Sequence, residues 1–283
     1  MGNVLITADS PCDLGESLQS RYQLHYYPYH IILDGKEYTD GVDITPDDLF
    51  KVYRERNLLP KTAAIGIGEY MDFLRPLVEQ GFEIVHFCLG SALSAAYQNC
   101  CAAAEELGHV YPVDARSLST GIGLQVIEAA EMARTGLSAA EIQAEAKKLA
   151  DRSHASFILD TLEFMHAGGR CSTVAALGAN LLKLKPCIEV HPEKNGAMEV
   201  GKKYRGDLKK VLVQYTKDTL NRDDLQLDRV FITHSGIPQE YIDLVRDTII
   251  SCADFQEIHV TRASSTISCH CGPNTLGVLF LTK

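Results

Sequence analysis

The pattern of apolar and polar positions in the first half of the chain is typical of a sheet wrapped by helices. The run "FEIVHFCL" from residue 82 is apolar almost throughout, as a strand buried on both faces is, and "HVYPVDA" from residue 109 predicts another strand. Between residues 68 and 81 apolar side chains recur on one helical face: Tyr70, Phe73, Leu74, Leu77 and Val78. This alternation predicts a mostly parallel sheet flanked by helices.

Several helices in this half have capping signals at their predicted starts. Thr45 stands before Pro46 and two aspartates, an order that favours a helix beginning at Pro46. Ser138 and Glu141 have the spacing of a capping box, which predicts another helix start. The small residues around Ser94 are expected to lead into an alanine-rich helix that ends at Gly108.

The pattern changes from about residue 154 onward. Asn195 and Gly196 lie between two strand-like runs and are the commonest cue for a type I′ hairpin turn. Further strands are predicted at "DRVFITHSG", "FQEIHVTRA" and "LGVLFLTK", with a helix at "QEYIDLVRDTIISC". We therefore expect an α/β protein of two domains, an N-terminal α/β domain in residues 1–153 and an α+β domain with a mixed or antiparallel sheet in residues 154–283.

Composition narrows the class of protein. Apolar residues make up 46% of the 283 positions and charged residues 23%, which is too apolar for a disordered chain. The formal net charge of -10 argues against nucleic acid, because phosphate binding needs patches of Lys and Arg. No segment approaches the roughly 18 apolar residues of a membrane span, and the first residues lack the basic region of a signal peptide. We expect a cytoplasmic protein.

The cysteines predict free thiols rather than disulfides or a metal. There are 9 of them, an odd number, and the CxxC spacing of zinc ribbons does not occur. In "TISCHCGPNTLG", an extended conformation over residues 267–271 would send Cys269 and Cys271 to one face and His270 to the other. The three would then not share one ion, so we expect no metal and no cofactor. His270 remains either a core histidine bonded to a carbonyl or a residue facing a cleft.

Three other positions have both a structural and a functional interpretation. Ser94 is either a helix N-cap or a binding hydroxyl at the end of a strand, and the two roles are compatible. Thr62, just before a predicted helix, has the same two interpretations. Arg170 in "HAGGRCS" either recognises a carboxylate, phosphate or partner protein, or is solvated beside glycines that end a helix. Asp9 and Asp13 are expected to bond their own backbone in a turn rather than a metal.

Seven stretches taken together resemble the DegV family of bacterial lipid-binding proteins, which includes the fatty acid-binding subunits of the fatty acid kinase system. The stretches are "DSPCDL" near the start, "YTDGVDIT" at 38–45, "PKTAAIG" at 60–66, "GSALSAAYQN" at 90–99, "TLEFMHAGGRCS" at 161–172, "LLKLKPCIEV" at 181–190 and "HCGPNTLG" at 270–277. Their order and spacing extend over nearly the whole chain, which makes the set specific although each stretch alone is weak.

The resemblance implies two α/β domains with a long-chain fatty acid between or beneath them. It implies that the carboxylate is held by Thr62, Ser94 with the adjacent Ala95, and His270. It also implies that the surface near the "GGR" stretch docks a kinase that phosphorylates the bound acyl carboxylate. Arg170 is then a candidate for partner contact rather than for contact with the lipid.

The chain departs from the usual family pattern around these residues. "AAIG" follows Thr62 where the family usually has Ser-Gln-Pro-Ser, and Ala95-Ala96 follows Ser94 where Gly-Thr is common. Asn274 replaces a frequent glycine in the last turn. Hydroxyl groups near the expected carboxylate site are therefore lost.

Two other functions remain as alternatives. An acyl hydrolase would use Ser94 as nucleophile and His270 as base, but the chain lacks a GxSxG elbow and an evident carboxylate to orient the histidine. A lipid-responsive regulator would bind the same ligand without a kinase partner. The carrier function is preferred because the resemblance implies a kinase partner. For the ligand itself, an apolar tunnel contributes roughly 0.8 kcal/mol per methylene, while two hydroxyls and an imidazole satisfy the carboxylate.

Overall fold

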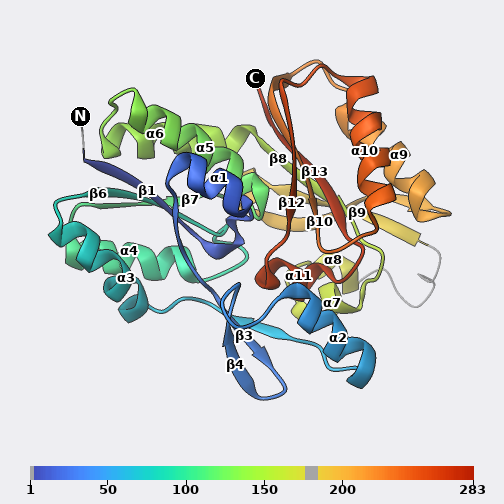
Figure 1. Ribbon diagram of the computed structural model, residues 1–283, viewed down its shortest axis with the longest axis horizontal. Coiled ribbons are helices and arrows are strands. Elements are labelled where there is room, and N and C mark those ends of the chain that lie inside the picture. The colour runs from blue at the N-terminus through green and yellow to red at the C-terminus, as the bar shows by residue number, and fades with distance from the viewer. Residues whose placement is uncertain (1–2, 176–183) are drawn as a thin grey trace.

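The computed structural model describes residues 3–175 and 184–283, which form three β-sheets and the helices around them (Figure 1). In the N-terminal sheet the strands lie in the order β2-β1-β6-β7. Their bounds are Val4–Asp9 for β1, His25–Tyr27 for β2, Glu83–Cys88 for β6 and Val110–Asp114 for β7. Every pairing in this sheet is parallel, which confirms the mostly parallel sheet predicted for this half.

Helices cover both faces of the N-terminal sheet. In Figure 1, α5 (Thr120–Arg134) and α6 (Ala139–Arg152) lie on one face, and α3 (Ile67–Glu79) and α4 (Ala96–Leu107) lie on the other. A shorter helix, α1 (Gly15–Tyr22), packs beside α5. The predicted capping box is present at the start of α6, where Ser138 and Glu141 bond each other's backbone N–H groups. Local sequence therefore determines this helix start.

The second sheet has six strands in the order β10-β9-β8-β13-β11-β12. The strands are β8 Ser153–Ile158, β9 Leu184–His191, β10 Ala197–Arg205, β11 Leu225–His234, β12 Glu257–Arg262 and β13 Leu276–Thr282. All pairings are antiparallel except that of β11 with β12. Helices α9 (Leu208–Leu220) and α10 (Gln239–Cys252) lie together at one side of it in Figure 1. The mixed sheet predicted for the C-terminal half is confirmed.

A third, antiparallel sheet was not predicted from the sequence. Its strands β3 (His30–Leu33), β4 (Lys36–Thr39) and β5 (Lys61–Ala63) lie in the order β4-β3-β5, next to α2 (Pro46–Arg56). Ile31 and Phe50 of this region pack in one apolar cluster with Phe164 of α7 (Glu163–Gly168) and Cys269 of α11 (Ser265–Cys271). The small sheet is thereby attached to the C-terminal half, and this attachment positions Thr62.

The extended conformation considered for residues 267–271 is wrong, because these residues belong to α11. The Ser264 side chain accepts a hydrogen bond from the N–H of Ile267, and the Asp40 carboxylate accepts from the N–H groups of Ser265 and Thr266. A carboxylate from a distant loop therefore satisfies the helix start, as a local cap would. This long-range contact is invisible in the local pattern.

The hairpin predicted at Asn195 and Gly196 is present between β9 and β10, but its connection is longer than a two-residue turn. A 3-10 turn at Pro192–Lys194 precedes Asn195, which has a positive φ of 57°. Gly196 also has a positive φ, 85°, as the turn requires. The cue therefore identified the hairpin correctly and its turn type incorrectly.

Some expectations stay as predictions. The larger apolar core contains residues of both large sheets, among them Phe87 and Leu279, and the domain boundary at residue 153 remains a prediction. Residues 181–183 of "LLKLKPCIEV" lie outside the described part of the chain. Over residues 3–175 and 184–283, no helix combines the length and the apolar character needed to cross a bilayer.

Candidate functional site

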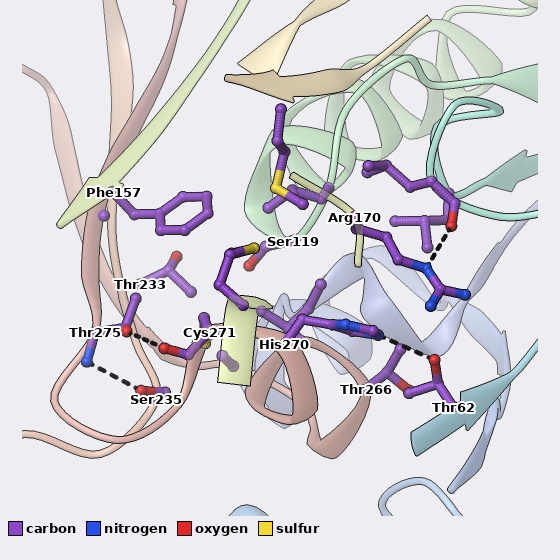
Figure 2. A pocket seen from close by; sticks show the side chains of 18 of the residues that line it. Thr62, Ser119, Phe157, Arg170, Thr233, Ser235, Thr266, His270, Cys271 and Thr275 are labelled. Atoms are coloured by element: carbon purple, nitrogen blue, oxygen red, sulfur yellow. Dashed lines mark hydrogen bonds between the residues drawn. The ribbon is translucent and has the colours of Figure 1, made fainter. Parts of the chain in front are cut away.

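A cavity of about 230 Å³ lies where the three sheets meet (Figure 2). Its lining includes residues from the loop after β6, from β5 and β8, and from α7, α11, β11 and β13. The apolar part of the lining includes Ala64, Leu89, Leu93, Ala95, Leu118, Phe157, Met165, Met198, Ala263, Ile267 and Leu279. The elements that form it are thus far apart in the sequence.

All of the binding residues named from the sequence line this cavity. They are Thr62, Ser94, Ala95, His270 and Arg170. Thr62 Oγ1 and His270 Nε2 lie 3.0 Å apart and share a hydrogen bond, although the two residues are 208 positions apart in the chain. Thr62 reaches this position from the short strand β5, not from a helix cap. The structure therefore brings the predicted hydroxyl and imidazole into direct contact.

Ser94 lies next to the start of α4 and lines the cavity, but the N-cap of that helix is Ala95 and not Ser94. The Ser94 Oγ accepts a hydrogen bond of 3.2 Å from the N–H of Ala96, the first residue of α4. The hydroxyl of Tyr29 donates to the same Oγ at 3.0 Å. Tyr29 is 2% exposed and also lines the cavity. Tyr29 was not predicted from the sequence, since nothing in "HYYPYH" distinguishes it from its neighbouring aromatic residues.

His270 lies at the end of α11 with its ring in a restricted space. Its Nδ1 is buried and has no hydrogen-bond partner among the described residues. Burial and, second, the nearby Arg170 cation lower the pKa of His270 to about 4. The imidazole is therefore neutral near pH 7. A hydrogen bond that it donates at that pH comes from an uncharged ring.

Arg170 lies at the exposed edge of the cavity. Its Nη1 donates to the carbonyl of Gly168 at 2.7 Å, and its Nε donates to the carbonyl of Leu93 at 3.4 Å. The side chain is exposed and lines the cavity as well. The guanidinium is thus within the electrostatic range of His270 and is accessible from outside the molecule.

The remaining hydroxyl-bearing side chains in the lining are bonded to other protein groups. Their partners are Asp13 for Ser119, Thr120 and Thr261 for Thr233, Gly272 for Ser235, Asp40 for Thr266 and Cys271 for Thr275. Because these hydroxyls are engaged elsewhere, such side chains present mostly carbon to the cavity. The cavity is consequently more apolar than its residue composition indicates.

Asp9 and Asp13 do not bond their own turn, so that expectation is wrong. Asp13 accepts from the hydroxyl of Ser119 and from the N–H of Ser264, which links the cavity lining to the start of α11. Burial raises the pKa of Asp13 to about 7. Asp9 accepts from Tyr70 and from the N–H of Leu89. Both carboxylates serve as buried acceptors for distant donors.

Known proteins match this chain over nearly its whole length. The family model described as an uncharacterised protein of the DegV family matches residues 3–283. A DegV domain-containing protein of Caldanaerobacter subterraneus subsp. tengcongensis is 28% identical over 287 residues, with 100% of both chains covered.

Solved structures of other proteins also match the chain over nearly its whole length. The chain resembles a DegV family protein from Thermus thermophilus, whose structure is described as showing fatty acid binding, with a TM-score of 0.88, 26% identity and 99% of each chain covered. It also resembles a stearic acid-binding protein from Eubacterium ventriosum, with a TM-score of 0.84 and 25% identity over 100% of this chain and 99% of that one.

Proposed function

The chain belongs to the DegV family, and we propose that it binds a long-chain fatty acid in the cavity, with the carboxylate held by Thr62, Ser94 and His270. The observation that carries this proposal is the composition of the lining. Three hydrogen-bonding side chains from distant segments line a cavity whose other hydroxyls are engaged elsewhere. The fatty acids bound by the Thermus thermophilus and Eubacterium ventriosum proteins support the ligand class.

The acyl tail supplies most of the affinity. Moving one methylene from water to an apolar site contributes roughly 0.8 kcal/mol, so a chain of about 16 carbons gains on the order of 10 kcal/mol before ordering costs. Phe157, Met165 and Leu279 offer the apolar surface for such a tail. Methionine adapts its shape to an irregular chain, which suits a flexible ligand.

The carboxylate needs donors because burying an unpaired charge costs several kcal/mol. The hydroxyl of Ser94 can donate to the carboxylate directly, and Thr62 and His270 can donate to it once it replaces the hydrogen bond that they share. The start of α4 at Ala95 adds a favourable helix dipole. Tyr29 holds the Ser94 oxygen in place through its hydrogen bond of 3.0 Å.

We further propose that the protein is a carrier that presents the bound acid to a separate fatty acid kinase. Arg170 is exposed at the edge of the cavity, beside the carboxylate-binding residues, which suits contact with a partner. A carrier of this kind needs no nucleophile of its own. The hydrogen bonds of Thr62, Ser94 and His270 hold the acid, and the kinase supplies the phosphoryl group.

The hydrolase alternative has less support. In the described part of the chain, Ser94 bonds Tyr29 and the N–H of Ala96, while His270 bonds Thr62. A serine nucleophile needs a hydrogen bond to its base, and a third group to orient that base. His270 Nδ1, where such a group would bind, lies against Gly168 instead. The contacts favour binding over acyl transfer.

The direct test is mass spectrometry of lipid extracted from the purified protein, followed by titration of the delipidated protein with fatty acids. We expect a long-chain fatty acid at about one per chain and saturable rebinding. Addition of a bacterial fatty acid kinase and ATP should then yield acyl phosphate. Binding without any acyl phosphate would favour the regulator, and absence of any lipid binding would overturn the proposal. Turnover of acyl esters that Ser94→Ala abolishes would favour the hydrolase.

A further inference from the structure

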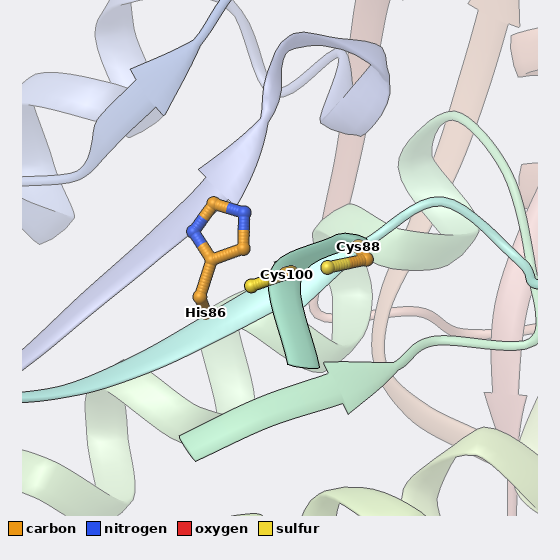
Figure 3. Close-up of side chains that lie close together, drawn as sticks. All are labelled: His86, Cys88 and Cys100. Atoms are coloured by element: carbon orange, nitrogen blue, oxygen red, sulfur yellow. The ribbon is translucent and has the colours of Figure 1, made fainter. Parts of the chain in front are cut away.

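A second group of side chains with metal-binding chemistry lies away from the cavity, inside the N-terminal half. His86, Cys88 and Cys100 each offer one possible ligand atom, and these atoms all lie within 4.8 Å of one another (Figure 3). All three residues are fully buried, at 0% exposure. The three residues were not predicted as a site from the sequence, because a His-x-Cys pair and a cysteine in a later helix form no known metal motif.

The positions are fixed by regular elements. His86 and Cys88 are two residues apart on β6, so their side chains project from the same face of the strand. Cys100 lies in α4, which packs against that strand. Binding groups on strands and helices hold their geometry better than groups on loops. The three donors are therefore arranged before any ion binds.

The histidine ring is also held in one orientation. Its Nδ1 lies 2.8 Å from the hydroxyl of Thr7, and its Nε2 lies 3.0 Å from the carboxylate of Asp9. An ion would replace one of these two bonds, and the other would continue to orient the ring. Histidines that bind metals usually keep such a partner on the second nitrogen. The surroundings of His86 supply one for either nitrogen.

The donor set determines which ion fits. Two thiolates and one imidazole are characteristic of zinc sites, and soft thiolate ligands exclude magnesium and calcium. Two thiolates neutralise a divalent cation, whereas a monovalent ion would leave one more negative charge beside the buried carboxylate of Asp9, which is costly. We propose that His86, Cys88 and Cys100 form a binding site for Zn²⁺, with both thiols releasing their protons to solvent on binding.

The test uses the full chain, reduced and refolded without oxygen in the presence of Co²⁺ as a spectroscopic probe, since a buried site loads during folding. We expect one Co²⁺ per chain, a sulfur-to-cobalt charge-transfer band, and displacement of Co²⁺ by Zn²⁺. Cys100→Ala should lose the band and weaken metal binding by at least about tenfold. The matched control is Cys101→Ala, because Cys101 is the next residue in α4 and is outside the cluster.

A second measurement separates metal binding from folding defects. Zn²⁺ should raise the melting temperature of the parent and of Cys101→Ala, and it should leave that of Cys100→Ala unchanged. Cys100 lies in an alanine-rich helix, so the alanine variant is expected to fold. Absence of Co²⁺ and Zn²⁺ uptake by the parent, equal uptake by Cys100→Ala, or uptake of Cu⁺ alone would each overturn the proposal.

Discussion

The ring of His270 lies so close to Gly168 that a β-carbon on that glycine would be 2.2 Å from Nδ1. The two glycines of the "GGR" stretch therefore have different roles. Gly169 ends α7 in a left-handed conformation, with a φ of 66°, as a helix C-cap does. Gly168 instead provides the space that allows His270 to reach Thr62.

Gly168→Ala should therefore displace the His270 ring and weaken fatty acid binding. The expected loss is about 1 to 3 kcal/mol, the usual cost of a lost polar contact at a buried group. Titration of the delipidated variant with a fatty acid measures it. Gly68→Ala is the control, because nothing lies within 4 Å of a β-carbon there, and its affinity should equal that of the parent. Unchanged affinity in Gly168→Ala would show that the ring position is not needed.

Thr62→Val and Ser94→Ala should each weaken binding by about 1 to 3 kcal/mol, because each removes a donor from the carboxylate. Val keeps the shape of Thr at position 62, so the change isolates the hydroxyl. Ser91→Ala is the control for Ser94, since Ser91 is in the same loop and is not part of the cavity lining. Parent-like affinity in both variants would remove these residues from the carboxylate site.

Tyr29→Phe tests whether the Ser94 hydroxyl needs its partner. The variant keeps the buried ring and loses the hydrogen bond of 3.0 Å to Ser94. We expect fatty acid affinity to fall by about 0.5 to 1.5 kcal/mol, the net value of one hydrogen bond. In the double variant with Ser94→Ala, Tyr29→Phe should cause little further loss, because the two residues act through one bond. Fully additive losses would contradict this coupling.

The parts of the fold that the sequence predicted have local causes. The helix start at Thr45, the capping box at Ser138 and the apolar strand β6 depend on neighbouring residues, and each is present in the structure. The strands of the third sheet have three or four residues and mixed burial, which gives no clear periodicity. The helix at residues 265–271 depends on Asp40, which is far away in sequence.

Local sequence and long-range contacts also contribute differently to the two candidate sites, the cavity and the group of His86, Cys88 and Cys100. Thr62, Ser94 and His270 were identified by resemblance to a family, and the cavity that they share depends on tertiary packing. Tyr29 was missed because its function depends on a contact with a residue 65 positions away. The group of His86, Cys88 and Cys100 was missed for a related reason, since its third member comes from another element.

His270 should make the stability of the lipid-free protein depend on pH. Burial lowers its pKa from the ordinary value of 6.5 to about 4 in the folded state. Above pH 6.5 the ring is neutral in both states and contributes no pH dependence. As the pH falls from 6.5 to 4, the unfolded chain binds a proton that the folded chain does not, so stability is lost.

The substitution His270→Gln removes this titrating group. The unfolding free energy of the parent relative to that of His270→Gln should fall between pH 6.5 and 4 by at most about 1.4 kcal/mol per pH unit. Denaturant unfolding of both proteins at several pH values measures the difference, and other titrating groups, such as Asp13, cancel. A difference that is constant from pH 7 to pH 4.5 would contradict the lowered pKa.

Arg170→Ala separates the two roles that its position allows. The side chain is exposed at the edge of the cavity and bonds only backbone carbonyls among the contacts described, those of Gly168 and Leu93. If it contacts the kinase, the variant should bind fatty acid like the parent and lose about 2 kcal/mol in its interaction with the kinase, as exposed arginines at interface centres do. Arg75→Ala, an exposed arginine of α3, is the control for a general effect of charge. Fatty acid titration and acyl phosphate formation are measured on the same samples. A large loss of fatty acid affinity, with kinase interaction intact, would instead make Arg170 a partner of the carboxylate.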